Sequence, residues 1–322
     1  MSGWTPVKPV GFATVLDPEI QPIVDMMEAG SDTPAHLVPI EQARAAHDLQ
    51  SAIMGGPGEE VAEVREISVP GPGGPIPVRV YRPACEGPLP LVAYAHGGGW
   101  AVGSLDGFGP VSRALANASG AIVASIDYRL APEHPFPAGL DDVRAAVRWL
   151  AENAREFDGD PDRVAIAGDS AGGNLATVTA RRLRDEGGSP LRYQALVYPV
   201  CDSALNTPSY RESAEGFGLS ALSMKRFWEL YLDGADGRVP DASPLQAGDL
   251  SGLPPAFILT VRDDVLRDEG EAYARALEAA GVPVTLRRYD GAVHGFFRWI
   301  EKSRLSRRAV AEVGAALREA LA

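Results

Sequence analysis

Apolar residues are grouped along this chain in short continuous runs, and longer stretches with helical spacing separate these runs. Short uninterrupted apolar runs are typical of strands buried on both faces of a sheet, and the amphipathic stretches between them predict helices. The alternation predicts an α/β fold with a mostly parallel, doubly wound sheet flanked by helices. We expect strands at 91–96, 121–127, 163–168, 193–199, 256–261 and 284–289, and helices at 109–119, 139–154, 170–185, 265–280 and 303–321.

The N-terminal part of the chain has a different pattern. Residues 17–29 and 40–53 carry apolar positions at helical spacing, and a break rich in Gly and Pro follows the second stretch. Residues 61–69 and 76–81 then alternate apolar and polar positions around the turn sequence PGPGGP, which predicts a β-hairpin at a sheet edge.

Residues 202–240 interrupt the alternation of strands and helices. They show no strand pattern, and their one helical stretch, Leu222–Leu232, is rich in aromatic residues. We therefore expect an inserted cap above the carboxyl edge of the sheet, which is where open α/β sheets bind ligands. The predicted division is an N-terminal helical cap segment (1–55), a core in two parts (56–201 and 241–322) and a cap insertion (202–240).

Composition and charge restrict the partners. With 45% hydrophobic and 23% charged residues among 322, the chain is expected to fold around a sizeable core. The formal net charge of −13 argues against nucleic acid or an anionic membrane as a partner, because phosphate binding needs clustered Lys and Arg. No apolar stretch approaches the roughly 18 residues of a membrane span, so a membrane partner is not expected.

The N-terminal sequence and the cysteines bear on location. Residues 1–20 have no basic segment followed by an apolar core, so no secretory signal is predicted. Cys85 and Cys201 are too few for a disulfide framework or a cysteine-based zinc site, and we expect both thiols to be buried. These features favour a cytoplasmic protein.

The sequence GDSAG at 168–172 has the form G-x-S-x-G, in which a serine projects from a sharp turn between a strand and a helix. The predicted strand before it and helix after it match that context. Ser170 is therefore the candidate nucleophile. The alternative is an ordinary serine that caps the following helix, a position that serine often occupies.

A second glycine-rich sequence, HGGGW, follows the predicted strand at 91–96. Backbone without side chains can approach a substrate closely and point N–H groups at a developing oxyanion. We assign Gly98 and Gly99, together with Ala171 after the serine, as the oxyanion donors. A phosphate-binding loop would need G-x-G-x-x-G or G-K-[ST], which are absent here. His96 is expected to fix the loop and not to transfer protons.

An activated serine needs a base and an acid, which follow it in the order Ser, Asp or Glu, His in this fold class. His294 is the histidine that lies after Ser170, in a loop with glycines on both sides. The acid should follow the strand at 256–261, and Asp264 is the choice over Asp263. Asp268 falls in the first turn of the next helix, where a carboxylate is favourable for structural reasons alone.

These motifs together resemble the bacterial hormone-sensitive-lipase-like esterases, family IV of the bacterial lipolytic enzymes, in the branch that carries GDSAG. The resemblance covers roughly residues 60–320 and runs in the family's order through HGGGW, DYRLAPEHPFPA, GDSAGGN, DVLRDEG and HGF. It implies the α/β-hydrolase fold with Ser170, Asp264 and His294 as nucleophile, acid and base. Val265 stands where many relatives have Pro, which leaves Asp263 open.

The motifs and the resemblance imply a serine carboxylesterase acting on small, uncharged esters of short to medium acyl chain, without a metal or cofactor. An amidase with the same triad remains an alternative, whereas a non-catalytic receptor is disfavoured by the presence of His294. Similar enzymes commonly dimerise through the last sheet edge, which makes a homodimer a candidate assembly. Asp127, Arg129 and Glu133 are expected to brace the loops. The candidate pocket residues are Trp100, Phe108, Phe217 and Leu219, while Leu222 and Trp228 are equally consistent with the core of the cap.

Overall fold

The predicted strands lie in one eight-stranded sheet with the order β1-β2-β4-β3-β5-β6-β7-β8. The computed structural model describes residues 15–29, 33–215 and 217–322, so the first 14 residues of the predicted cap segment, with most of the N-terminal stretch examined for a signal, lie outside it. The strands are β1 (Glu63–Gly71), β2 (Gly74–Arg82), β3 (Leu89–Ala95), β4 (Ile122–Ile126), β5 (Gly159–Asp169), β6 (Leu191–Val197), β7 (Ala256–Asp263) and β8 (Val284–Val293).

The sheet is parallel from β4 through β3, β5, β6 and β7 to β8, as the apolar runs predict. The hairpin of β1 and β2 is also confirmed, and β2 joins it to the sheet by pairing antiparallel with β4. Strand β1, with one face exposed, is left at the edge, which explains why its sequence alternates while the central strands are apolar throughout.

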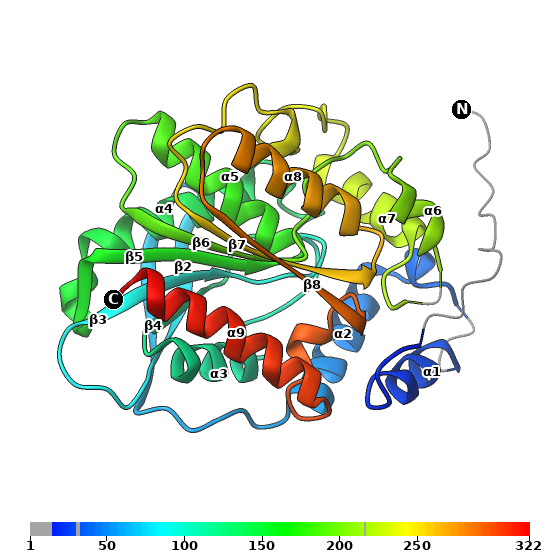
Figure 1. The fold of residues 1–322 in the computed structure, drawn as a ribbon, viewed down its shortest axis with the longest axis horizontal. Helices are drawn as coiled ribbons and strands as arrows, with labels where there is room; N and C mark the ends of the chain where they lie inside the picture. The colour runs from blue at the N-terminus through cyan, green and yellow to red at the C-terminus, as the bar shows by residue number, and fades with distance from the viewer. Residues whose placement is uncertain (1–14, 30–32, 216) are drawn as a thin grey trace.

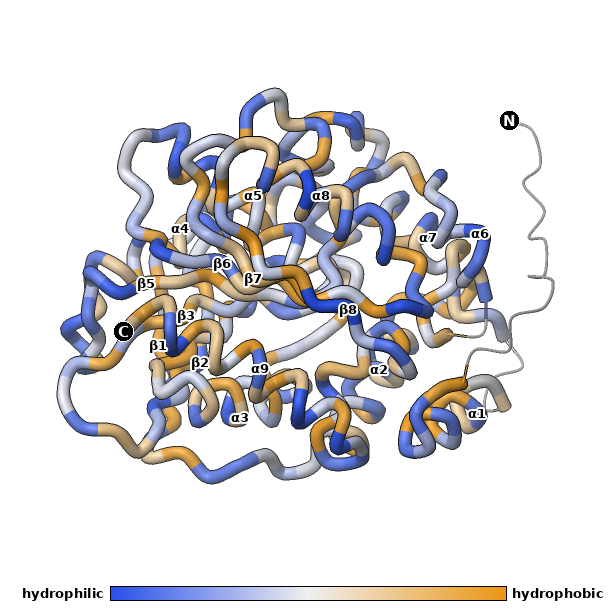
Figure 2. Tube along the Cα trace, in the orientation of Figure 1, coloured by the Kyte–Doolittle hydropathy of each residue, from blue (hydrophilic) through white to orange (hydrophobic). Residues whose placement is uncertain are grey.

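Helices cover both faces of the sheet, with α3 and α9 on one side and α4, α5 and α8 on the other (Figure 1). Side chains of β3 show why both faces must be covered: Leu91 and Ala93 enter one cluster of buried residues, and Val92 and Tyr94 enter the other. Hydrophobic colour is accordingly concentrated along central strands such as β7 (Figure 2). These helices are α3 (Gly109–Ser119), α4 (Ala138–Glu152), α5 (Ala171–Asp185), α8 (Arg267–Ala279) and α9 (Arg304–Ala320).

The remaining helices gather at the end of the molecule where β7 and β8 terminate (Figure 1). They come from the two predicted cap segments and cover the carboxyl edge of the sheet. Helix α7 is N-capped by Ser220, whose hydroxyl accepts a hydrogen bond from the Ser223 N–H. The described residues of 202–240 contain no strand, as expected. These helices are α1 (Gln21–Ala29), α2 (Ile40–Gly55), α6 (Pro208–Glu212) and α7 (Ala221–Leu232), with a 3-10 turn, η1, at Ala35–Leu37.

The cysteines depart from expectation in one respect. Cys201 is buried, but Cys85 is exposed, because it lies in the connection between β2 and β3 and not in a strand. Both are free thiols. In the part of the chain that the structure describes, no helix is both long enough and apolar enough to span a membrane.

Candidate active site

Ser170 occupies a strained turn between β5 and α5. Its backbone has φ 55° and ψ −121°, a conformation that residues other than glycine rarely adopt and that costs of order 1–3 kcal/mol. A β-carbon on Gly168 would lie 2.3 Å from the Gly172 carbonyl oxygen, and one on Gly172 would lie 2.0 Å from that of Ala95. The glycines of the motif are therefore required by close contacts. The serine side chain makes no capping hydrogen bond to α5, so the helix-cap alternative is wrong.

His294 bridges the serine and an aspartate. Its Nε2 lies 3.0 Å from Ser170 Oγ, and its Nδ1 lies 2.7 Å from Asp264 Oδ2. Asp264 directly follows β7 and His294 directly follows β8, so the parallel strands deliver both side chains to the edge where β5 delivers the serine. Asp264 is 1% exposed, and its other oxygen accepts a hydrogen bond from the Leu266 N–H at 2.9 Å.

The neighbouring aspartates have other positions. The hydrogen bond to His294 is made by Asp264, while Asp263 is the last residue of β7. Asp268 lies in the first turn of α8, as predicted, where it accepts a hydrogen bond from the Ser209 N–H and forms an ion pair with Arg267. The three carboxylates are close in the sequence, but their contacts differ, and it is Asp264 that bonds His294 Nδ1.

The glycine turn, residues 98–102, lies beside the serine. Its first three residues have positive φ angles of 118°, 58° and 58°, and the N–H groups of Ala101 and Val102 both donate to the Gly98 carbonyl. Gly98 and Gly99 line the same cavity as Ser170 and His294. Ala171 is the first residue of α5, where a backbone N–H has no partner inside the helix.

His96 fixes the start of this turn, as expected. Its Nδ1 lies 2.7 Å from the Gly97 carbonyl oxygen, and burial lowers its pKa to about 4, so the ring is neutral near pH 7. Asp169 connects the turn to the serine, because one of its oxygens accepts hydrogen bonds from the Gly97 N–H and the Tyr94 hydroxyl. Burial raises the pKa of this carboxyl, and the positive charge of Arg298 opposes that rise.

The serine and the histidine open into a cavity of about 150 Å³. Of the four predicted pocket residues only Leu219 lines this cavity. The prediction is wrong for Trp100, Phe108 and Phe217. Trp100 is 1% exposed because its ring stacks on Tyr231 of α7, and Phe108 is buried beside His96 and Arg298. Phe217 packs against the apolar core cluster beside the sheet. Trp228 also belongs to the core of the cap, 4.6 Å from the Trp100 ring.

A second, largely apolar cavity of about 400 Å³ adjoins the first and is lined by residues of α1, η1, α2 and α7. It forms an outer groove between the two cap segments. Apart from Leu219, sequence reasoning missed the residues common to both cavities, although the helical spacing of Met27 and Phe227 placed them on predicted cap helices. The shared lining residues are Met27, His47, Gln50, Val102, Gly218, Leu219 and Phe227.

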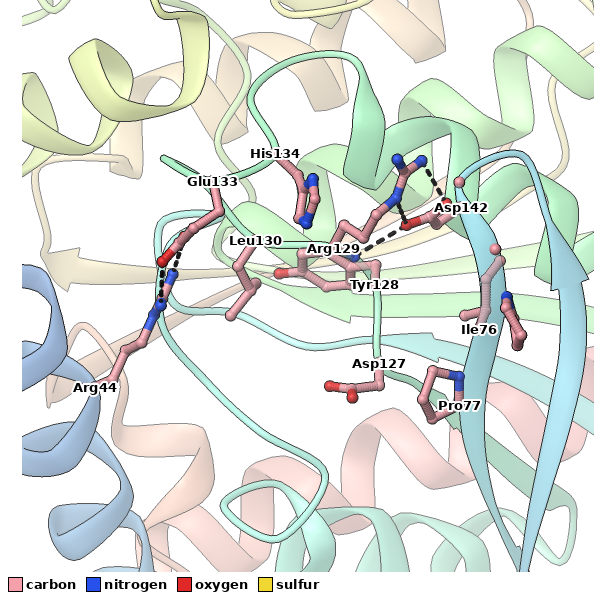
Figure 3. A pocket seen from close by; sticks show the side chains of 13 residues that line it. Arg44, Ile76, Pro77, Asp127, Tyr128, Arg129, Leu130, Glu133, His134 and Asp142 are labelled. Carbon is pink, nitrogen blue, oxygen red and sulfur yellow. Dashed lines mark hydrogen bonds and ion pairs between the residues drawn. The ribbon is translucent and has the colours of Figure 1, made fainter.

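The charged residues of DYRLAPEHPFPA lie away from the serine, around a separate pocket of about 420 Å³ (Figure 3). Arg129 forms an ion pair with Asp142 of α4, and Glu133 forms one with Arg44 of α2. Both pairs link this loop to a helix, consistent with a bracing role. Within residues 15–29, 33–215 and 217–322, no group of three or more His, Cys, Asp or Glu side chains is arranged to hold a metal ion.

Comparisons with known proteins agree with this architecture. A family model described as alpha/beta hydrolase fold matches residues 92–298. The carboxylesterase NlhH of Mycobacterium tuberculosis is 50% identical over 69% of this chain and 71% of its own length, and an ethyl acetate hydrolase of Pseudomonas putida is 37% identical over 88% and 92%. The solved hyperthermophilic esterase of Pyrobaculum calidifontis is 41% identical, with a TM-score of 0.91 over 96% of this chain and 100% of that one.

Proposed function

This chain belongs to the alpha/beta hydrolase family as a carboxylic ester hydrolase of the hormone-sensitive-lipase-like type, and we propose that it works through an acyl-enzyme on Ser170. The observation that carries the proposal is the pair of contacts made by His294, to Ser170 Oγ at 3.0 Å and to Asp264 at 2.7 Å. A nucleophile, a base in contact with it and a third group that orients the base are the parts that covalent catalysis by serine requires.

The reaction begins when His294 Nε2 accepts the Ser170 proton while Oγ attacks the ester carbonyl. Asp264 holds the other ring nitrogen as the donor tautomer and stabilises the imidazolium that forms. The alcohol then leaves with the proton from His294. A water molecule next attacks the acyl-enzyme, again with His294 as base, and releases the carboxylic acid.

The tetrahedral oxyanion is stabilised by the N–H groups of Gly98, Gly99 and Ala171. Support for this role comes from the positions of the glycines, which line the cavity beside Ser170, and of Ala171 at the positive end of the α5 dipole. Oriented backbone N–H groups need no reorganisation when the charge develops, which is why such groups lower the barrier.

The proposed substrates are small, uncharged esters with short to medium acyl chains, and the sizes of the two cavities support this choice. The chamber of about 150 Å³ is smaller than the roughly 300–1,000 Å³ of pockets that hold drug-sized ligands, which favours a short acyl group. A somewhat longer chain would extend past Leu219 and Phe227 into the outer groove, whose lining is mostly apolar. The scheme includes no metal or cofactor. We retain the cytoplasm as the proposed location and the homodimer as a candidate assembly.

The proposal is tested by kinetics on an ester and its matching anilide across a short acyl series. We expect p-nitrophenyl esters to be cleaved far faster than the anilides, with an optimum well below twelve carbons. Ser170→Ala should reduce kcat by more than about 10³-fold with the fold intact, because the covalent route is lost. Equal rates on ester and anilide would favour the amidase alternative, and full turnover by the alanine variant would refute the serine mechanism.

A further inference from the structure

The glycine turn needs support from outside itself. Trp100 is held at φ 58°, in the left-handed region where a residue with a β-carbon costs roughly 1–2 kcal/mol, and two positive-φ residues precede it. Both internal hydrogen bonds of the turn end on one carbonyl, that of Gly98. Strained backbone of this kind persists only where surrounding contacts over-determine it.

Arg44 of α2 supplies several of those contacts. Its Nε donates to the Ala101 carbonyl at 2.9 Å, and its Nη2 donates to the Ala131 carbonyl at 3.0 Å. Nη1 and Nη2 also bind the two carboxylate oxygens of Glu133, at 2.7 and 2.6 Å (Figure 3). The Ala131 N–H in turn donates to the Trp100 carbonyl at 2.9 Å. One guanidinium therefore connects a cap helix to the glycine turn and to the loop that supports it.

The ion pair with Glu133 orients this guanidinium. As a half-exposed pair it would add little stability alone, but a bidentate carboxylate fixes the plane of the fork and so aims Nε at Ala101. Hydrogen bonds from Arg44 lower the pKa of Glu133 to about 2, which keeps the carboxylate ionised at any pH used for an esterase assay. The two charges of the pair are therefore unchanged across the assay range.

Helix α7, which belongs to the other cap segment, packs against the glycine turn. A β-carbon on Gly99 would lie 2.2 Å from the Phe227 ring, which shows how closely that ring covers the backbone. The Trp100 ring packs on Tyr231 and Trp228, at centroid distances of 4.2 and 4.6 Å. The turn is thus held by both cap segments, by polar contacts from α2 and by aromatic contacts from α7.

We propose that Arg44 is a positioning residue for ester hydrolysis, which holds the glycine turn so that the Gly98 and Gly99 N–H groups point at the oxyanion. The cap would then do more than enclose the substrate, because docking of α2 completes the oxyanion hole. This inference rests on the proposed function, since it assumes a tetrahedral oxyanion formed at Ser170.

The test compares Arg44→Met and Arg44→Lys with a matched control, Arg163→Met. Arg163 likewise forms an ion pair, with Asp160, and donates to two backbone carbonyls, but it lies in the first half of β5, whereas the serine follows the end of that strand. The readouts are kcat and KM for p-nitrophenyl butyrate and the inhibition constant of an alkyl trifluoromethyl ketone. That ketone adds to the serine and places a negative oxygen in the oxyanion hole.

We expect Arg44→Met to lower kcat by about 10- to 100-fold with KM changed by less than about 3-fold, since displaced donors cost somewhat less than a deleted one. Affinity for the ketone should fall by the same factor as kcat/KM. Arg44→Lys should lose activity in the same pattern, because an ammonium lacks the planar fork that binds the carboxylate and both carbonyls. Arg163→Met should retain the wild-type kcat and ketone affinity.

The inference is overturned if Arg44→Met keeps wild-type ketone affinity, if only KM changes, or if Arg163→Met loses as much. Should the methionine variant fail to fold, the lysine variant is judged by the same measurements. Failure of the proposed function would look different, because wild-type enzyme itself would then resist the ketone.

Discussion

Replacing Asp264 with Asn gives a sharp test of how the carboxylate acts. One Asp264 oxygen accepts the Leu266 N–H at 2.9 Å, and the other faces His294 Nδ1 at 2.7 Å. In Asp264→Asn the amide oxygen must face the Leu266 donor, so the amide NH₂ is turned toward His294. Nδ1 then has to accept a hydrogen bond, and the ring proton moves to Nε2, which faces Ser170. In that tautomer the imidazole cannot take the serine proton.

The expected loss is about 10⁴-fold in kcat, the cost of the wrong tautomer in serine hydrolases, which corresponds to about 5 kcal/mol of transition-state stabilisation. The assay is steady-state hydrolysis of p-nitrophenyl butyrate, with urea unfolding to establish that the variant is folded. Asp263→Asn is the control, since the hydrogen bond to His294 Nδ1 is made by Asp264. Retention of more than about a tenth of wild-type kcat by Asp264→Asn, or an equal loss in Asp263→Asn, would refute this role of the carboxylate.

Three further outcomes can be measured. Gly172→Ala should lower the free energy of unfolding in urea by about 2 kcal/mol or more, because its β-carbon would meet the Ala95 carbonyl at 2.0 Å, whereas Gly188→Ala, with open space around it, should have little effect. Phe227→Ala should raise kcat/KM for octanoate relative to butyrate esters by joining the chamber to the outer groove, and an unchanged ratio would count against that path. Burial lowers the folded-state pKa of His96 from 6.5 to about 4, so it opposes folding increasingly as pH falls from about 6.5 to 4, by about 3 kcal/mol in all. His96→Gln should flatten that part of the stability profile, and an equally steep profile would contradict the assignment.

Much of the fold was predictable because each central strand is buried on both faces and each outer helix on one. The ends of the strands were less predictable. Strand β5 begins at Gly159, ahead of the apolar run that starts near residue 163, because its first residues continue to pair with β3 after a register shift. Antiparallel pairing of β2 with β4 was also not foreseeable, since alternation in a strand identifies a half-covered face but not the neighbour.

The meeting of Ser170, His294 and Asp264 was predictable because chain order and the strand ends constrain these positions strongly. The pocket was not, because side-chain direction depends on backbone that the sequence does not reveal. Trp100 follows two glycines in left-handed conformation, and the turn directs its ring into the core of the cap and not toward the cavity beside Ser170. On α7, Phe227 and Trp228 are adjacent aromatics, yet only Phe227 lines both cavities. Arg44 had no sequence signal, since its partners lie about 57 and 89 residues further along the chain.

The central claim is that Ser170 carries the acyl group, and mass spectrometry of the quenched reaction tests it most directly. Enzyme mixed with p-nitrophenyl butyrate and acidified within the first turnovers should show a mass increase equal to one butyryl group, located by digestion on the peptide that contains Ser170. The Ser170→Ala variant should show none. A butyryl group on another residue, or turnover with no covalent intermediate when deacylation is slow enough to trap one, would contradict the account.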